Sequence, residues 1–243
     1  MSERILKALM QLFAIIAKGE LNEETGEVNY DVGGRKIVRQ FLRQELNQEL
    51  IKEYLSLFDE FLLSHQGKSS KKVGKRKRTS VNSVKVLRIC TEINEELTQR
   101  QKIIVLIRIL EFIYANDVVT EQELEFVTTV AETFNIPKEE FDDCLAFVNA
   151  DETAIIDKEV CLVIDNSKET KLKNSKHIYS ERIVGFLRVI RVQSVNTYFV
   201  RYYGNHGLYL NGQIITQDRV QVLTQGSSLR SSRVQPIYYS DII

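Results

Sequence analysis

The sequence lacks an apolar run of the roughly 20 residues that a membrane-spanning helix requires. Its best candidate, residues 103–115, is interrupted by Arg108 and Glu111. Residues 1–17 also depart from the pattern of a signal peptide, because they combine charged side chains with helical apolar spacing and have no small-residue cleavage site. These absences predict a cytoplasmic chain.

Cysteine and histidine are scarce, and neither forms a motif. Cys90, Cys144 and Cys161 are widely spaced among apolar neighbours, without a C-x-x-C pair, and the three histidines lie apart from them and from one another. We therefore expect reduced thiols in a cytosolic setting. The sequence gives no basis for a zinc site or a catalytic triad.

A phosphate-binding loop of the G-x-x-x-x-G-K-[ST] type is missing as well. Gly67, Lys68 and Ser69 match its last three positions, but Leu62 stands where the first glycine is required. The stretch also follows a predicted helix, whereas this loop follows a strand. We therefore predict that this chain binds no nucleotide or other cofactor and is not an enzyme.

Charge, in contrast, is abundant but unevenly distributed within a net charge of zero. Residues 67–80 contain seven basic and no acidic side chains. Residues 81–153 contain six basic and fifteen acidic side chains, and residues 154–243 contain twelve and seven. An acidic half therefore carries a basic insertion and is joined to a basic half.

Up to about residue 150, apolar residues recur with the spacing of amphipathic helices. The segment "KIIVLIRILEFIYA" is apolar nearly all round, which predicts a helix at the centre of a bundle. "FAIIAKGELNEE" lines up with "LEFIYANDVVTEQ", and each is followed by two further helical patterns. We predict an all-α bundle of two pseudo-symmetric halves over residues 1–152, separated by a flexible basic loop at 67–80.

From about Asp157 the pattern changes to short runs rich in Val, Ile, Tyr and Phe, separated by turn sequences such as "YGNHG" and "LNGQ". This pattern predicts a small all-β domain, sandwich- or barrel-like, over residues 153–243. The whole chain would then have an α+β fold. The last residues, Ile242 and Ile243, are apolar, so we expect the sequence to continue in a longer protein.

The basic run supports three interpretations. It could bind the phosphates of single-stranded RNA, with aromatic side chains of the strand "YFVRYY" (residues 198–203) stacking on bases. It could face anionic lipid beside a membrane. The interpretation we favour is a solvated insertion, and an aromatic strand is more often part of a core. The basic side chains concerned are Lys68, Lys71, Lys72, Lys75, Arg76, Lys77 and Arg78.

The segment "ANDVVTEQE" offers the carboxylates of Asp117, Glu121 and Glu123 to a divalent metal ion. The same residues have a structural interpretation that we favour. Thr120 as N-cap and Glu123 three residues later form a capping box, and Glu121 interacts favourably with the helix dipole.

The buried helix, "ANDVVTEQE" and the two helical patterns that follow resemble the tellurite-resistance B-like family. Its pattern A-x-D-G-x-[apolar]-[ST]-x-x-E is matched except that Val118 replaces the usual glycine. The resemblance covers about residues 1–150 and implies a cytosolic helical bundle whose acidic positions are sometimes proposed as metal ligands. The matching residues are Ala115, Asp117, Val119, Thr120 and Glu123.

The order of a helical domain before a β-domain with "YFVRYYGNHGLYLNGQ" is similar to the N-terminal cytosolic region of certain large bacterial ABC-transporter ATP-binding proteins. "GLYLNGQII" also resembles a forkhead-associated sandwich, but the Gly-Arg and S-x-x-H elements that hold phosphothreonine are absent. The similarity implies a non-catalytic regulatory or docking region at the inner face of the membrane. Its partners would be the downstream ATPase cassette, where ATP and Mg bind, or another cytosolic protein.

Two other functions remain open at this stage. A free-standing stress-response binding protein would use the helical domain alone, with a divalent metal bound at the acidic positions. A single-stranded RNA-binding protein would use the basic run and the aromatic strand, although we expect nucleic acid to be the less favoured partner.

Overall fold

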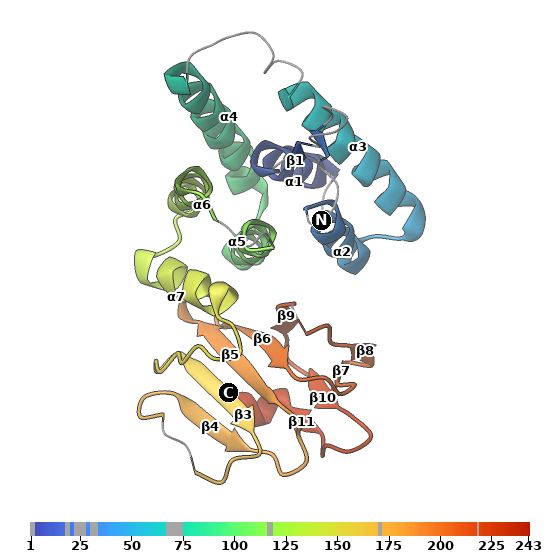
Figure 1. Cartoon of the computed structure of the whole chain (residues 1–243), viewed down its shortest axis with the longest axis vertical. Helices are drawn as coiled ribbons and strands as arrows, with labels where there is room; N and C mark the ends of the chain where they lie inside the picture. Colours follow the sequence, from blue (N-terminus) through green and yellow to red (C-terminus); the bar gives the residue numbers. More distant parts are fainter. Residues whose placement is uncertain are drawn as a thin grey trace. The chain divides into compact units, whose positions relative to one another are not determined.

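The computed structural model describes residues 3–17, 20–21, 28–29, 34–66, 75–115, 119–169, 172–217 and 219–243. It divides into two compact units, Met1–Lys138 and Glu139–Ile243. The first is helical and the second is built mainly of strands, which confirms the predicted α+β class with a helical N-terminal part (Figure 1).

The first unit contains helices α1 to α6 and a short antiparallel pair, β1 with β2. Figure 1 shows α1 between α3 and α4, and α1 contacts both of them. α2 contacts α3 and α5, and α4 contacts α6. The bounds are α1 Glu3–Ile16, β1 Glu20–Leu21, β2 Val28–Asn29, α2 Gly34–Glu45, α3 Gln48–Gln66, α4 Lys75–Glu96, α5 Gln99–Ile113 and α6 Glu121–Thr133.

The core of this unit forms around α5, as its apolar sequence predicts. Phe112 of α5 stacks on Phe13 of α1 with ring centroids 5.5 Å apart, and Phe13 also meets Phe41 of α2 edge-on. α5 is buried along most of its length, including three charged side chains, two of which bond each other. Arg108 donates to Glu111 at 2.6 Å, so these charges enter the core as a pair, which limits their desolvation cost.

Helix α4 begins at Lys75, so the prediction of a flexible loop over residues 67–80 is wrong for its second part. Lysine and arginine are good helix formers, and residues 75–80 contain neither proline nor glycine. The helix that buries Val86, Ile89 and Cys90 therefore extends back into the basic run. Residues 67–74 lie outside the described part of the chain.

The second unit starts with α7, which spans Lys138–Asn149. A five-stranded sheet follows in the order β4-β3-β5-β6-β9, with β3 and β4 parallel and the other pairs antiparallel. A four-stranded sheet has the order β11-β10-β7-β8. The bounds are β3 Cys161–Asp165, β4 Lys176–Tyr179, β5 Phe186–Val192, a 3-10 turn Gln193–Val195, β6 Thr197–Tyr203, β7 Tyr209–Leu210, β8 Gln213–Ile214, β9 Gln221–Leu223, β10 Ser228–Arg230, β11 Ile237–Tyr238 and α8 Tyr239–Ile242.

Strands β5 and β6 are buried on both faces, which explains their nearly continuous apolar sequences. On one face, Leu187, Val189 and Val200 join Leu210 and Leu229 of the other sheet in one hydrophobic cluster. The tight Asn211–Gly212 turn between β7 and β8 has φ values of 52° and 83°. Both residues adopt the positive φ that a two-residue hairpin turn requires, as the Asn-Gly pair predicts.

The opposite face of β5 and β6 holds the C-terminal end of α7. Arg201 donates to the carbonyl oxygens of Val148 at 2.7 Å and Ala150 at 3.1 Å, and the Tyr203 hydroxyl donates to Ala150 at 2.9 Å. These bonds satisfy carbonyls that the end of a helix leaves unpaired. We predicted a boundary at residue 152, whereas the compact units divide after Lys138, so α7 belongs with the strands.

Candidate functional site

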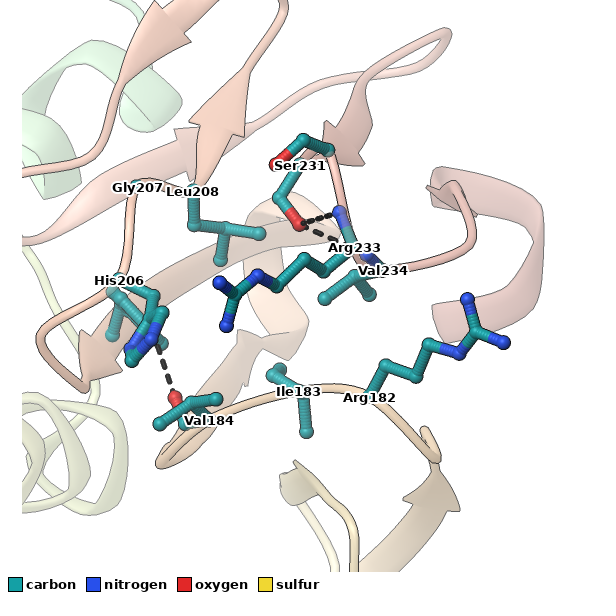
Figure 2. Close-up of a pocket in the computed structure, with 11 residues that line it drawn as sticks. Arg182, Ile183, Val184, His206, Gly207, Leu208, Ser231, Arg233 and Val234 are labelled. Carbon is teal, nitrogen blue, oxygen red and sulfur yellow. Dashed lines mark hydrogen bonds between the residues drawn. The ribbon is translucent and has the colours of Figure 1, made fainter.

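The second unit contains a pocket of about 210 Å³ formed by three loops (Figure 2). The first loop joins β4 to β5, the second joins β6 to β7, and the third joins β10 to β11. The fold of the second unit therefore brings together segments that lie far apart in the sequence. The lining residues are Arg182, Ile183, Val184, Tyr202, His206, Gly207, Leu208, Ser231, Ser232, Arg233 and Val234.

The floor of the pocket is apolar and firmly held. Ile183, Leu208 and Val234 line it, and all three are buried members of the hydrophobic cluster. The buried Tyr202 donates its hydroxyl hydrogen to the Val184 carbonyl at 2.7 Å, which ties the first loop to β6. The floor therefore continues the core and does not depend on exposed side chains.

The first loop enters β5 through Gly185, whose backbone no other residue could adopt without strain. Its φ is +78°, and an added Cβ would lie 1.9 Å from the Tyr203 carbonyl oxygen. Glycine alone combines positive φ with so close an approach of two backbones. The path of the loop beside the pocket is thus set by one residue of the chain.

The rim of the pocket is cationic and carries hydroxyl groups. In Figure 2, the Arg233 side chain extends across the pocket between Leu208 and Ile183, whereas the Arg182 side chain points away. Neither arginine forms an ion pair with a residue that the structure describes. Ser231 Oγ accepts from the backbone nitrogens of Arg233 at 3.1 Å and Val234 at 2.9 Å, which fixes the third loop.

This arrangement favours an anionic ligand group. None of the eleven lining residues carries a carboxylate, and residues 182–243 contain seven basic but only two acidic side chains. A guanidinium can bind a carboxylate or a phosphoryl group through two parallel hydrogen bonds. The apolar floor would contact the part of the ligand that bears this group.

The predicted metal ligands are not brought together among the described residues. Asp117 lies outside them, and Glu121 is exposed in the first turn of α6. Glu123 is buried, and its Oε2 accepts from Thr120 N and Thr120 Oγ1, both at 2.8 Å. The capping box is therefore confirmed. In the part of the chain that the structure describes, no group of three His, Cys, Asp or Glu side chains is arranged to hold a metal ion.

The basic run cannot be placed as a site. Lys68, Lys71 and Lys72 lie outside the described residues. Lys75, Arg76, Lys77 and Arg78 form the start of α4, but their side chains are not among those described. Contact of this run with an anionic surface stays a prediction.

The aromatic strand is part of the core. Tyr198 and Tyr202 of β6 are only 7% and 2% exposed, and Phe199 is fully buried. The RNA hypothesis needed these rings on a surface where bases could stack, so it is wrong for this strand. The reason is that β6 lies in the interior of the five-stranded sheet, with both faces covered.

The three cysteines are free and buried. Burial raises the pKa of the thiols of Cys90 and Cys144 to about 12 and that of Cys161 to about 11. Since the thiolate is the reactive form, these residues are chemically inert near neutral pH.

No helix in the described ranges is long and apolar enough to cross a membrane. A scan against protein-family models and searches of curated proteins and of solved structures found no match.

The three-loop pocket could not be predicted from the sequence, because its lining comes from three separate loops. The turn sequence "YGNHG" indicated one of these loops but not its neighbours.

Proposed function

We propose that this chain is a non-catalytic docking region of an ABC-type transport ATPase, and that its β unit binds a protein partner through the three-loop pocket. The observation that carries the proposal is the position of Arg233, an arginine without an ion-pair partner among the described residues, over a buried apolar floor.

The size of the pocket supports a single side chain as its ligand. Sites for cofactors and drug-sized molecules typically enclose about 300–1,000 Å³, whereas this pocket encloses about 210 Å³. The anionic group would be a carboxylate or a phosphoryl group on a protein segment, bound by Arg233. Apolar atoms of the same segment would contact Ile183, Leu208 and Val234.

The proposed partner is the ATPase cassette of the same protein or another cytosolic protein, with the chain at the inner face of the membrane. The similarity to N-terminal regions of ABC-transporter proteins supports this assignment. The coding sequence after Ile243 tests it: a G-x-x-x-x-G-K-[ST] motif following a strand, and membrane-length apolar runs, are expected. A stop codon directly after Ile243 would contradict the transporter assignment but not binding at the pocket.

Binding at the pocket can be mapped by NMR with end-blocked peptides that carry aspartate, glutamate, a phosphorylated side chain or only neutral residues. We expect the anionic peptides to shift the backbone signals of residues 206–208 and 231–234, and the neutral peptides to leave them unchanged. The carboxylate and phosphoryl arms separate the two sources of negative charge. Shifts confined to other surfaces, or equal shifts with neutral peptides, would show that this pocket is not an anion site.

A further inference from the structure

The outward face of the four-stranded sheet carries a continuous row of side chains that the core does not use. The strands place Ile214 of β8 opposite Tyr209 of β7, and Tyr209 opposite Arg230 of β10. Tyr238 of β11 lies on the same side, because the Arg230 guanidinium lies over its ring at 5.8 Å. We call these four residues the β8–β11 row.

The row is exposed, while the alternate residues of the same strands are buried. Ile214 is 63% exposed, Tyr238 46% and Tyr209 42%. Leu210, Leu229 and Ile237, on the other face, belong to the hydrophobic cluster. A polar outer face would be the ordinary pattern for such a sheet. Here a large aliphatic side chain, two tyrosines and an arginine stand in its place.

The four strands contain no acidic residue, and Arg230 is the charged member of the row. One carboxylate lies beside them, because Asp241 of α8 accepts from Tyr238 N at 2.8 Å. Arg230 forms no ion pair with a residue that the structure describes, and the same holds for Arg233 three positions later. A surface that covers this row should therefore offer negative charge at Arg230 and accept the apolar side chain of Ile214.

We propose that the β8–β11 row is a contact face for an anionic bilayer surface. Tyrosine is enriched at the boundary between headgroups and acyl chains, where its ring and hydroxyl meet different environments. Arg230, held over the Tyr238 ring, is placed to pair with lipid phosphates. Ile214, two residues beyond the Asn211–Gly212 turn, is the side chain that enters the apolar layer.

A single-stranded nucleic acid fits this face less well. Base stacking uses free aromatic ring faces, but one face of Tyr238 already meets the Arg230 guanidinium. Ile214, which is 63% exposed, is aliphatic and has no role in stacking. The row shares no residue with the basic run or with the lining of the three-loop pocket, so it adds a second kind of contact to the proposed docking region.

Vesicle co-sedimentation of the full chain tests the proposal. The probes are vesicles of phosphatidylcholine alone and vesicles that also contain phosphatidylglycerol. To separate the row from the basic run, the seven basic residues of that run are replaced by glutamine in one background and kept in the other. We expect binding to the anionic vesicles only, in both backgrounds, and weaker at higher ionic strength.

Paired variants locate the contact. Ile214→Glu should lower the partition coefficient about tenfold, because it removes the inserted side chain and adds repulsion, and Arg230→Gln should lower it about fivefold. Ile155→Glu and Arg191→Gln are the controls, since Ile155 is 81% exposed and Arg191 is exposed, and both lie outside the row. Circular dichroism checks that all four variants are folded.

Three results would overturn the proposal. In the first, the chain whose basic run is replaced by glutamine fails to bind anionic vesicles. In the second, the row variants and their controls lose equal amounts of vesicle binding. In the third, the chain binds a single-stranded oligonucleotide and not vesicles, and only the row variants lose that binding. The peptide experiment on the pocket is unaffected by any of them, so the two proposals can fail separately.

Discussion

Two arginines of the five-stranded sheet, Arg188 and Arg201, show how single residues hold the second unit together. Arg188 is only 3% exposed. It donates to the Tyr203 hydroxyl at 2.9 Å and to the Ala154 carbonyl at 2.5 Å. Together with Arg201 it satisfies backbone carbonyls of the segment that leaves α7. A buried arginine here replaces the regular backbone pairing that this segment lacks.

Replacing Arg188 should therefore be costly. We expect Arg188→Ala to lower the free energy of unfolding by about 2–3 kcal/mol, because charge-assisted hydrogen bonds are lost and buried carbonyls remain unpaired. The matched control is Arg191→Ala in the same strand, whose exposed side chain bonds Asn196 and whose loss should cost about 0.5 kcal/mol or less. Urea unfolding measures both. Equal losses would show that the Arg188 contacts are not important for stability.

The capping box of α6 permits a second prediction at this scale. Thr120→Ala removes the hydroxyl that accepts from Glu123 N and should lower stability by about 1 kcal/mol. Thr128→Ala, in the middle of the same helix, is the control: Thr128 only donates back to Leu124 O, and alanine has the better helix propensity. No loss should be observed for it. If Ca²⁺ or Mg²⁺ raised the Tm, and Asp117→Asn removed the gain, the metal hypothesis would be favoured instead.

At the scale of elements, the loop before β4 is organised by one carboxylate. Asp157 accepts from the backbone nitrogens of Lys173 at 3.0 Å, Asn174 at 2.9 Å and Ser175 at 2.8 Å. These donors, with Lys173 contributing most, lower the pKa of Asp157 to about 2. The carboxylate thereby positions β4 for its parallel pairing with β3, which no tight turn could achieve.

The pKa of Asp157 makes the stability of this unit depend on pH. An unfolded aspartate titrates near pH 3.9, so the stabilising contribution is fully present above about pH 4 and is lost as the pH falls toward 2. We expect wild type to melt at a higher temperature than Asp157→Asn at pH 6, with the difference shrinking between pH 4 and pH 2. Thermal melts at a series of pH values measure it. A difference that stays constant over this range would contradict the role given to the carboxylate.

At the scale of the whole molecule, the division into two compact units predicts which fragments of the chain can fold by themselves. A fragment of residues 137–243 keeps α7 and the carbonyls of Val148 and Ala150, to which Arg201 and Tyr203 donate. We expect it to unfold cooperatively, as monitored by urea and the near-ultraviolet signal of its tyrosines. A fragment of residues 153–243 leaves those buried donors without partners and should not. Similar cooperative unfolding of both would favour a boundary near residue 152.

Much of the fold could be predicted because local chemistry specifies it. The apolar spacing of α5, the Thr120–Glu123 cap and the Asn211–Gly212 turn depend on residues close together in the sequence. The position of α7 could not be found in this way, because Arg201 and Tyr203, which bond its C-terminal end, lie some fifty residues further along the chain. An amphipathic helix also does not reveal which core it covers. The core position favoured for the aromatic strand is confirmed, and the alternative in which its rings stack on RNA bases is wrong because both faces of β6 are buried.

The candidate site was less predictable than the fold. Only the folded structure brings Arg233 beside Leu208 and Ile183. The basic run is conspicuous in the sequence, but its side chains are not among those that the structure describes. Exposure, which also depends on the fold, separates Tyr209 and Tyr238 on the surface from Tyr198 and Tyr202 in the core. A chain with ten tyrosines does not reveal this division by itself.

The central claim is that Arg233 gives the three-loop pocket its affinity for an anionic group of a protein partner. Isothermal titration of the tightest-binding anionic peptide against wild type, Arg233→Ala and Arg182→Ala tests it most directly, because both arginines line the pocket but only Arg233 extends across it. We predict that Arg233→Ala raises the Kd about tenfold or more, through loss of a hydrogen bond to a charged group, and that Arg182→Ala changes it little. Equal effects of the two substitutions, or none from Arg233→Ala, would contradict the claim.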